Sequence, residues 1–167
     1  GWFQVFSLWQ VGAWIWGFKN KESLVRIKED WVHFRSFIDW SKHYFSAENV
    51  MDIQSDIWAD IIMAFDECAP GTSTHDYARA AMERTHRWAL RSHAQVMKNN
   101  EIRKNDWRHE QALFPIMQWV TYDDLRIESA KFITNNIPSH GVAIWWLSVW
   151  EAKPEMYRVL DVLNPHL

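Results

Sequence analysis

The sequence predicts an all-α protein, a multi-helix bundle of six to eight helices in a single domain over residues 1–167. Three observations lead to this prediction. Apolar side chains recur at steps of three and four along several segments, and residues that commonly cap or stop helices separate these segments. No stretch shows the sustained alternation that a strand with one buried face requires. A globin-like arrangement of the helices is the alternative.

The first half of the chain is predicted to form three helices. Residues 2–16 carry no charge and are apolar on nearly all sides, which predicts a helix surrounded by the core. Residues 21–45 follow as a second helix with an apolar stripe at steps of three and four. Ser46 is predicted to cap a third helix over residues 47–67.

The second half is predicted to hold the remaining helices, after a loop marked by the turn-forming pair Pro70-Gly71. Acidic residues open one of these helices, where the helix dipole favours negative charge. The predicted elements are residues 75–98 with Ser73 or Thr74 as cap and Asn99-Asn100 as stop, 102–120 with a kink or break at Pro115, a helix that begins after Thr121, 140–152, and a short helix from Pro154.

Tryptophan is the most unusual part of the composition. The chain has 13 Trp but only 5 Gly among 167 residues, whereas glycine alone usually makes up ~7% of a protein. Such a chain either lines a large, flat, apolar ligand or arose by a process that did not select against tryptophan. This composition favours a designed or orphan helical scaffold without catalytic activity. Exposed indoles would favour a homo-oligomer.

Charge and cysteine content exclude several classes. The net charge of −3 and the absence of a Lys/Arg cluster predict no nucleic-acid partner. No apolar run reaches the ~20 residues of a membrane span. Cys68 is the single cysteine, which is compatible with a cytoplasmic protein.

Glu83 and His86 have the Glu-x-x-His spacing of a bundle metal site, but the candidate partner acids lie opposite the apolar stripes, so no metal is predicted.

The alternative function is binding of haem or another planar hydrophobic molecule in a Trp-rich pocket. His86 and His93 are two turns apart, so both project from one side of their predicted helix, which Met82 and Met97 share. A histidine among such side chains is typical of an axial haem ligand. His93 is the first candidate ligand and His86 the second; no other cofactor is expected.

One segment supports the haem alternative by resemblance. Leu90-Arg91-Ser92-His93-Ala94 resembles the proximal-histidine helix of globins, and scattered aromatic positions such as Trp31, Phe34 and Tyr44-Phe45 are similar to those of sensor globins and protoglobins. The resemblance implies that Phe45 would pack on the haem.

Overall fold

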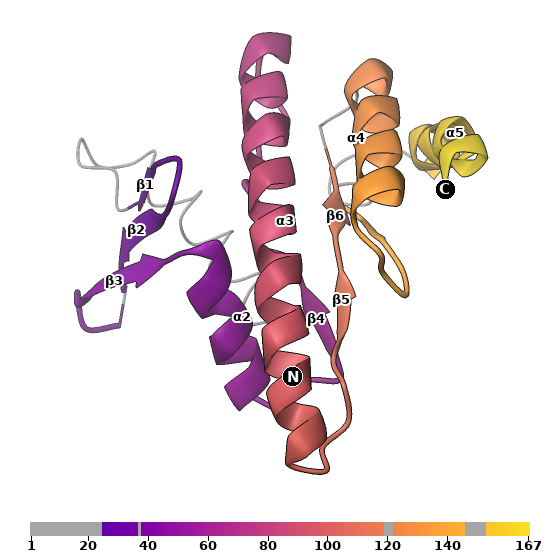
Figure 1. Ribbon diagram of the computed structural model, residues 1–167. Coiled ribbons are helices and arrows are strands. Elements are labelled where there is room, and N and C mark those ends of the chain that lie inside the picture. The colour runs from indigo at the N-terminus through magenta and orange to yellow at the C-terminus, as the bar shows by residue number, and fades with distance from the viewer. Residues whose placement is uncertain (1–24, 37, 119–121, 146–152) are drawn as a thin grey trace. The chain divides into compact units, whose positions relative to one another are not determined.

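The computed structural model describes residues 25–36, 38–118, 122–145 and 153–167 (Figure 1). The helix predicted over residues 2–16 lies outside them. The chain forms two compact units, which divide between Ser46 and Ala47.

The first unit contains an antiparallel sheet in the order β1-β2-β3. Its strands are β1 (Val25–Ile27), β2 (Val32–Arg35) and β3 (Lys42–Phe45). The helix predicted over residues 21–45 is therefore wrong. Ile27 lies opposite Val32, and Val32 lies opposite Phe45. The apolar spacing of three and four thus came from successive strands joined by tight turns, not from turns of one helix.

The second unit alternates strands and helices (Figure 1). Its elements in order are α2 (Ala47–Asp56), β4 (Ile61–Met63), α3 (His75–Asn105), β5 (Ala112–Phe114), β6 (Ile116–Met117), α4 (Asp123–Asn136), β7 (Ala143–Ile144), α5 (Lys153–Leu163) and the 3₁₀ turn η1 (Asn164–His166). α3 connects β4 to its parallel partner β5, and α4 connects β6 to its parallel partner β7. These are two consecutive βαβ units, the building block of α/β folds.

Pro115 separates the two parallel pairs. The N-terminal side of this proline pairs with β4, since the Ala64 N–H donates to the Phe114 carbonyl at 3.1 Å. The Pro115 carbonyl itself accepts from the Ala143 N–H at 2.9 Å, which starts the pairing with β7. A proline has no N–H to donate to a ladder, so the change of partner falls where a donor is missing.

The all-α bundle is therefore the wrong fold class, and so is its globin-like alternative. The described residues contain four helices together with three small sheets. The predicted helix over 47–67 ends at Asp56, and strands occupy parts of 61–67, 102–120 and 140–152. Parallel strands covered on both faces are short, continuous apolar runs without alternation, and periodicity alone cannot distinguish such runs from buried helix.

Three helix predictions are confirmed, and they are the ones supported by caps and long periodic segments. Thr74 caps α3, its hydroxyl oxygen accepting from the Tyr77 N–H at 3.4 Å. α4 and α5 begin close to the predicted starts. Asn99-Asn100 does not stop α3, because both side chains bond across to other segments: Asn100 pairs with the backbone of Gln111 at 2.8 and 3.0 Å.

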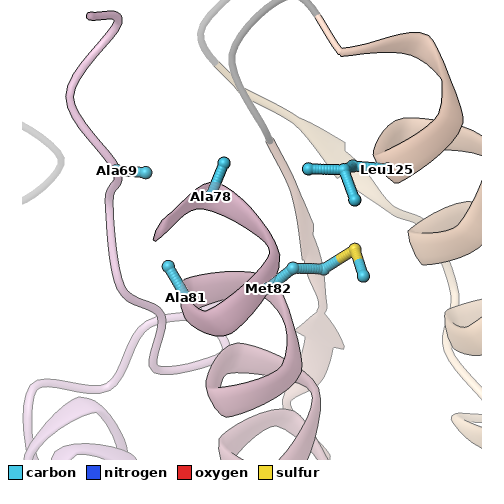
Figure 2. Packing of buried hydrophobic residues seen from close by; sticks show 5 residues of the cluster. All are labelled: Ala69, Ala78, Ala81, Met82 and Leu125. Carbon is cyan, nitrogen blue, oxygen red and sulfur yellow. The ribbon is translucent and has the colours of Figure 1, made fainter. Parts of the chain in front are cut away.

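Helices α3 and α4 pack together near their N-terminal ends. A small buried cluster joins them and includes the segment that follows β4 (Figure 2). Its members are Ala69, Ala78, Ala81, Met82 and Leu125. The three alanines leave room for the backbones to approach closely, and this contact fixes the segment after β4 beside both helix N-termini.

Candidate functional site at the carboxyl ends of the parallel strands

Polar side chains follow the parallel strands of the second unit. Asp66, Glu67 and Cys68 come shortly after β4, and Gln118 comes directly after β6. In α/β proteins, ligands bind at the carboxyl ends of the parallel strands. β4 and β6 belong to different two-stranded sheets, but hydrogen bonds of Gln118 join their carboxyl ends into one polar edge.

Gln118 joins these two strand ends. Its Nε2 donates to the Glu67 carbonyl at 2.9 Å and also to Oδ2 of Asp66. Both amide protons are thereby used. Its Oε1 is buried and accepts no hydrogen bond within the described part of the chain. A buried acceptor without a donor costs free energy, and such groups in native proteins commonly belong to functional sites.

The carboxyl group of Asp66 has a perturbed proton affinity. Desolvation is the largest cause and raises its pKa from 3.8 to about 7; the hydrogen bond from Gln118 lowers it, and the charge of Glu67 raises it. The site therefore holds an acid that changes charge near neutral pH. Perturbed acids of this kind concentrate at functional sites.

Glu67 points the other way and anchors the segment to α3. Its backbone N–H donates to Thr85 Oγ1 at 3.0 Å, and its carboxylate accepts from the Tyr77 hydroxyl at 2.8 Å and from Nη1 of Arg84. The Glu67 side chain is almost fully buried. This ion pair fixes the backbone on either side, so Asp66 is held in one orientation toward Gln118.

The end of β7 completes this edge. The Trp145 N–H donates to the Met117 carbonyl at 2.7 Å, which places Trp145 beside the residue before Gln118. Arg126, on the first turn of α4, is fully buried and donates from Nη2 to the Trp145 carbonyl at 3.5 Å. The edge thus combines a carboxyl group, an amide oxygen and a nearby guanidinium.

The predicted ligand-binding residues of α3 lie elsewhere. His86 is buried, its ring stacks on Phe132 at 4.1 Å between centroids, and its ring nitrogen Nε2 lies 2.9 Å from Ser129 Oγ. Burial lowers the pKa of His86 to about 4. Met82 belongs to the cluster of Figure 2. These two side chains have protein partners on the α3–α4 contact.

The other three predicted residues lie on α3 and in the first unit. His93 is half-buried on α3, and Met97 is exposed. Phe45 lies in β3 of the first unit, where it packs on Phe34 at 4.9 Å. No group of three or more His, Cys, Asp or Glu side chains among the described residues could hold a metal ion.

Two further expectations concern location and cofactors. None of the helices in the described ranges is both long and apolar enough to span a bilayer. The cytoplasmic location and the absence of a cofactor stay predictions.

The structure defines an α/β protein with a polar site at the carboxyl ends of its parallel strands. The family model for queuine tRNA-ribosyltransferase matches residues 1–167, so the chain belongs to that family. Three relatives are named queuine tRNA-ribosyltransferase. The protein of Herpetosiphon aurantiacus is 47% identical over 100% of this chain and 36% of the relative, and that of Ruminiclostridium cellulolyticum is 45% identical over 99% of this chain and 38% of the relative. The protein of Caldanaerobacter subterraneus is 44% identical over 100% of this chain and 38% of the relative. The chain thus spans little more than a third of each of these relatives.

Family membership overturns the functional predictions. A designed or orphan scaffold without catalytic activity is wrong, and so is the haem-binding alternative. The relatives are named as transferases acting on tRNA, which contradicts both the prediction of no enzyme and that of no nucleic-acid partner. Net charge was a poor guide because it averages the whole chain, whereas a nucleic-acid contact depends on the local distribution of charge.

Sequence reasoning missed Asp66 and Gln118 as site residues. A usable pattern was present: the apolar run Ile61-Ile62-Met63-Ala64-Phe65 ends directly in Asp66-Glu67, and Ile116-Met117 ends in Gln118. Polar residues at the end of a short apolar run are typical of a parallel strand leading into a site. Because both runs were interpreted as parts of helices, the polar residues after them were not recognised as strand ends that lead into a site.

Proposed function

We propose that this chain is part of a queuine tRNA-ribosyltransferase and that Asp66 and Gln118 bind the heterocyclic base. Family membership supports the reaction class. The free acceptor of Gln118 beside a partly buried carboxyl group supports the role of these two residues.

The chemistry of the pair fits one class of ligand edge. Both amide protons of Gln118 are donated to Asp66 and Glu67, so the side chain offers a ligand only its Oε1 acceptor. An ionised Asp66 is also purely an acceptor. A base edge that presents two or more N–H groups, as the amino-substituted edge of guanine does, would satisfy both. A site built to accept N–H groups discriminates strongly against a base that lacks them, since its buried acceptors would stay unpaired.

Enzyme variants test this assignment. In the full-length enzyme, we expect Gln118→Met to lower kcat/KM for the base by roughly 5- to 150-fold, because about 1–3 kcal/mol is lost when a buried polar contact cannot form. Asp66→Asn removes an ionised acceptor and is expected to lower the same constant by about 100-fold. Incorporation of labelled queuine into tRNA measures both, with KM determined separately for base and for tRNA.

Gln95→Met is the matched control. Gln95 is a half-buried glutamine on α3 whose amide donates to Asp52 at 2.8 Å, on the α2 side of that helix. We expect its kinetics to equal those of the parent enzyme. An unchanged KM for the base in both Gln118→Met and Asp66→Asn would contradict the assignment, even if KM for tRNA had risen.

A further inference from the structure

Three tryptophans adopt a backbone conformation that is normally reserved for glycine. The structure describes six of the 13 tryptophans, and Trp40, Trp58 and Trp107 among them have φ angles of 60°, 65° and 58°. No other non-glycine residue in the described ranges has a positive φ, and neither does any glycine there. A bulky side chain in this left-handed region is a genuine outlier, because its Cβ crowds the following carbonyl.

Trp107 occupies the position where helices most commonly end in glycine. It is the second residue after α3, and its N–H donates to the Lys104 carbonyl at 3.2 Å. The next N–H, that of Arg108, donates back to the Arg103 carbonyl at 2.8 Å. These two bonds are the Schellman motif, whose left-handed residue is usually glycine. The Trp107 side chain is 98% exposed, so no packing compensates the strain.

Trp58 and Trp40 hold equivalent positions. Trp58 is the second residue after α2, and its N–H donates to the Ser55 carbonyl at 3.1 Å, as at the end of α3. Trp40 is in the hairpin between β2 and β3, where its N–H donates to the Ser36 carbonyl at 3.0 Å. Glycine is the default residue where a tight turn needs a left-handed backbone. Both side chains are more than half exposed.

Trp88 shows what a structural tryptophan looks like in the same chain. It lies within α3, is fully buried, and stacks on Phe65 at 4.7 Å between ring centroids. The tryptophans therefore fall into at least two groups, one that the core requires and one that the backbone disfavours. Selection for packing explains only the first group.

We infer that Trp40, Trp58 and Trp107 are glycine positions, encoded by a codon that the source organism translates as glycine. The composition points the same way, since an excess of tryptophan coincides with a shortage of glycine. The codon UGA, whose meaning differs among organisms, is one base from the tryptophan codon UGG and one base from the glycine codon GGA. Reading UGA as tryptophan would place an indole wherever the organism uses UGA to insert glycine, while glycines encoded by other codons would stay glycine, as at Gly71 and Gly141. This inference does not rest on the proposed function.

The gene and the native protein test it directly. We expect UGA at codons 40, 58 and 107 and UGG at codon 88. Mass spectrometry of peptides from the native organism is expected to find glycine at the first three positions and tryptophan at position 88. UGG at the three positions, or tryptophan in the native peptides, would overturn the inference.

Stability of variants provides an independent test in the full chain. Trp107→Gly is expected to raise the midpoint of thermal unfolding by about 3 °C, because it relieves left-handed strain. Trp107→Ala removes the same exposed indole but keeps a Cβ, so its midpoint should stay below that of Trp107→Gly. Trp88→Gly, the control at a structural tryptophan, should lower the midpoint. Equal midpoints for Trp107→Gly and Trp107→Ala would contradict the role of backbone strain.

An exposed aromatic surface for nucleic acid is the competing explanation of Trp58. The guanidinium of Arg108 lies 4.8 Å from the centroid of this indole, and bases stack on such platforms. Binding of bulk tRNA separates the two explanations. We expect Trp58→Gly to leave the affinity unchanged; a loss of affinity would identify the indole as a binding group and overturn its assignment as glycine.

Discussion

Replacing Arg84 by methionine is expected to destabilise the protein by about 3 kcal/mol at pH 8. Glu67 is almost fully buried, and its carboxylate is balanced by the guanidinium of Arg84. Removing one partner of a buried ion pair leaves an uncompensated charge, which costs far more than the pair itself contributes. Urea unfolding of the full chain, followed by circular dichroism, measures the loss.

A second substitution separates this charge effect from a loss of packing. The double variant Arg84→Met with Glu67→Gln carries no unpaired charge, and the glutamine can still accept from the Tyr77 hydroxyl, which lies 2.8 Å from the carboxylate. We expect it to recover most of the lost stability. A double variant no more stable than Arg84→Met would show that packing dominates.

Asp66 and His86 are expected to give the stability opposite dependences on pH. Native Asp66 has a pKa of about 7 against 3.8 for the free group, so between these values only the native state holds the proton. Its contribution to stability therefore falls as the pH rises from 4 to 7, by at most about 4 kcal/mol. Asp66→Asn is expected to stabilise the protein at pH 7.5 by about 2 kcal/mol.

His86 acts in the reverse sense because its native pKa is lowered. At a pKa of about 4 against 6.5, the unfolded state binds the proton over most of this range. Its contribution to stability is present above pH 6.5 and is lost toward pH 4, by at most about 3 kcal/mol. The two slopes oppose each other between pH 4 and 6.5.

Urea midpoints measured from pH 4.5 to 8 reveal both groups separately. In Asp66→Asn the slope due to His86 remains, so stability should rise with pH. In His86→Phe, which keeps an aromatic ring against Phe132, the slope due to Asp66 remains, and stability should fall with pH. The parent protein is measured beside both variants. The exposed pair His75 and Asp124 is the same in all three proteins and therefore cancels in the comparison. Parallel profiles for the two variants would contradict the assignments.

These predictions share one structural origin. Asp66 is costly to the fold in its ionised form, yet it lies beside the free acceptor of Gln118. Residues that bind a ligand often destabilise the ligand-free protein, so that stability is lost where function is gained. The base-binding proposal and the predicted gain in stability of Asp66→Asn therefore belong together: the same substitution should stabilise the protein and impair the enzyme.

The sequence by itself determined the helices whose ends are marked by local capping and turn residues. Thr74 caps α3, acidic residues open α4, and the pair Pro70-Gly71 forms a turn in which the Ser73 N–H donates to the Pro70 carbonyl. Caps and turns depend on residues within four positions, so a single sequence is enough to predict them. The excess of tryptophan was also visible at once, although its meaning was not.

Only the tertiary structure decided the strands and the site. A run such as Ile61-Ile62-Met63 is equally compatible with buried helix or buried strand, and its pairing with residues 112–114 settles the choice. Asp66 and Gln118 are 52 positions apart and meet because α3 returns the chain to β5, the parallel partner of β4, from which the chain continues into β6. Likewise, a tryptophan is an ordinary residue until its φ angle is known, because strain resides in backbone conformation, which residue type alone does not specify.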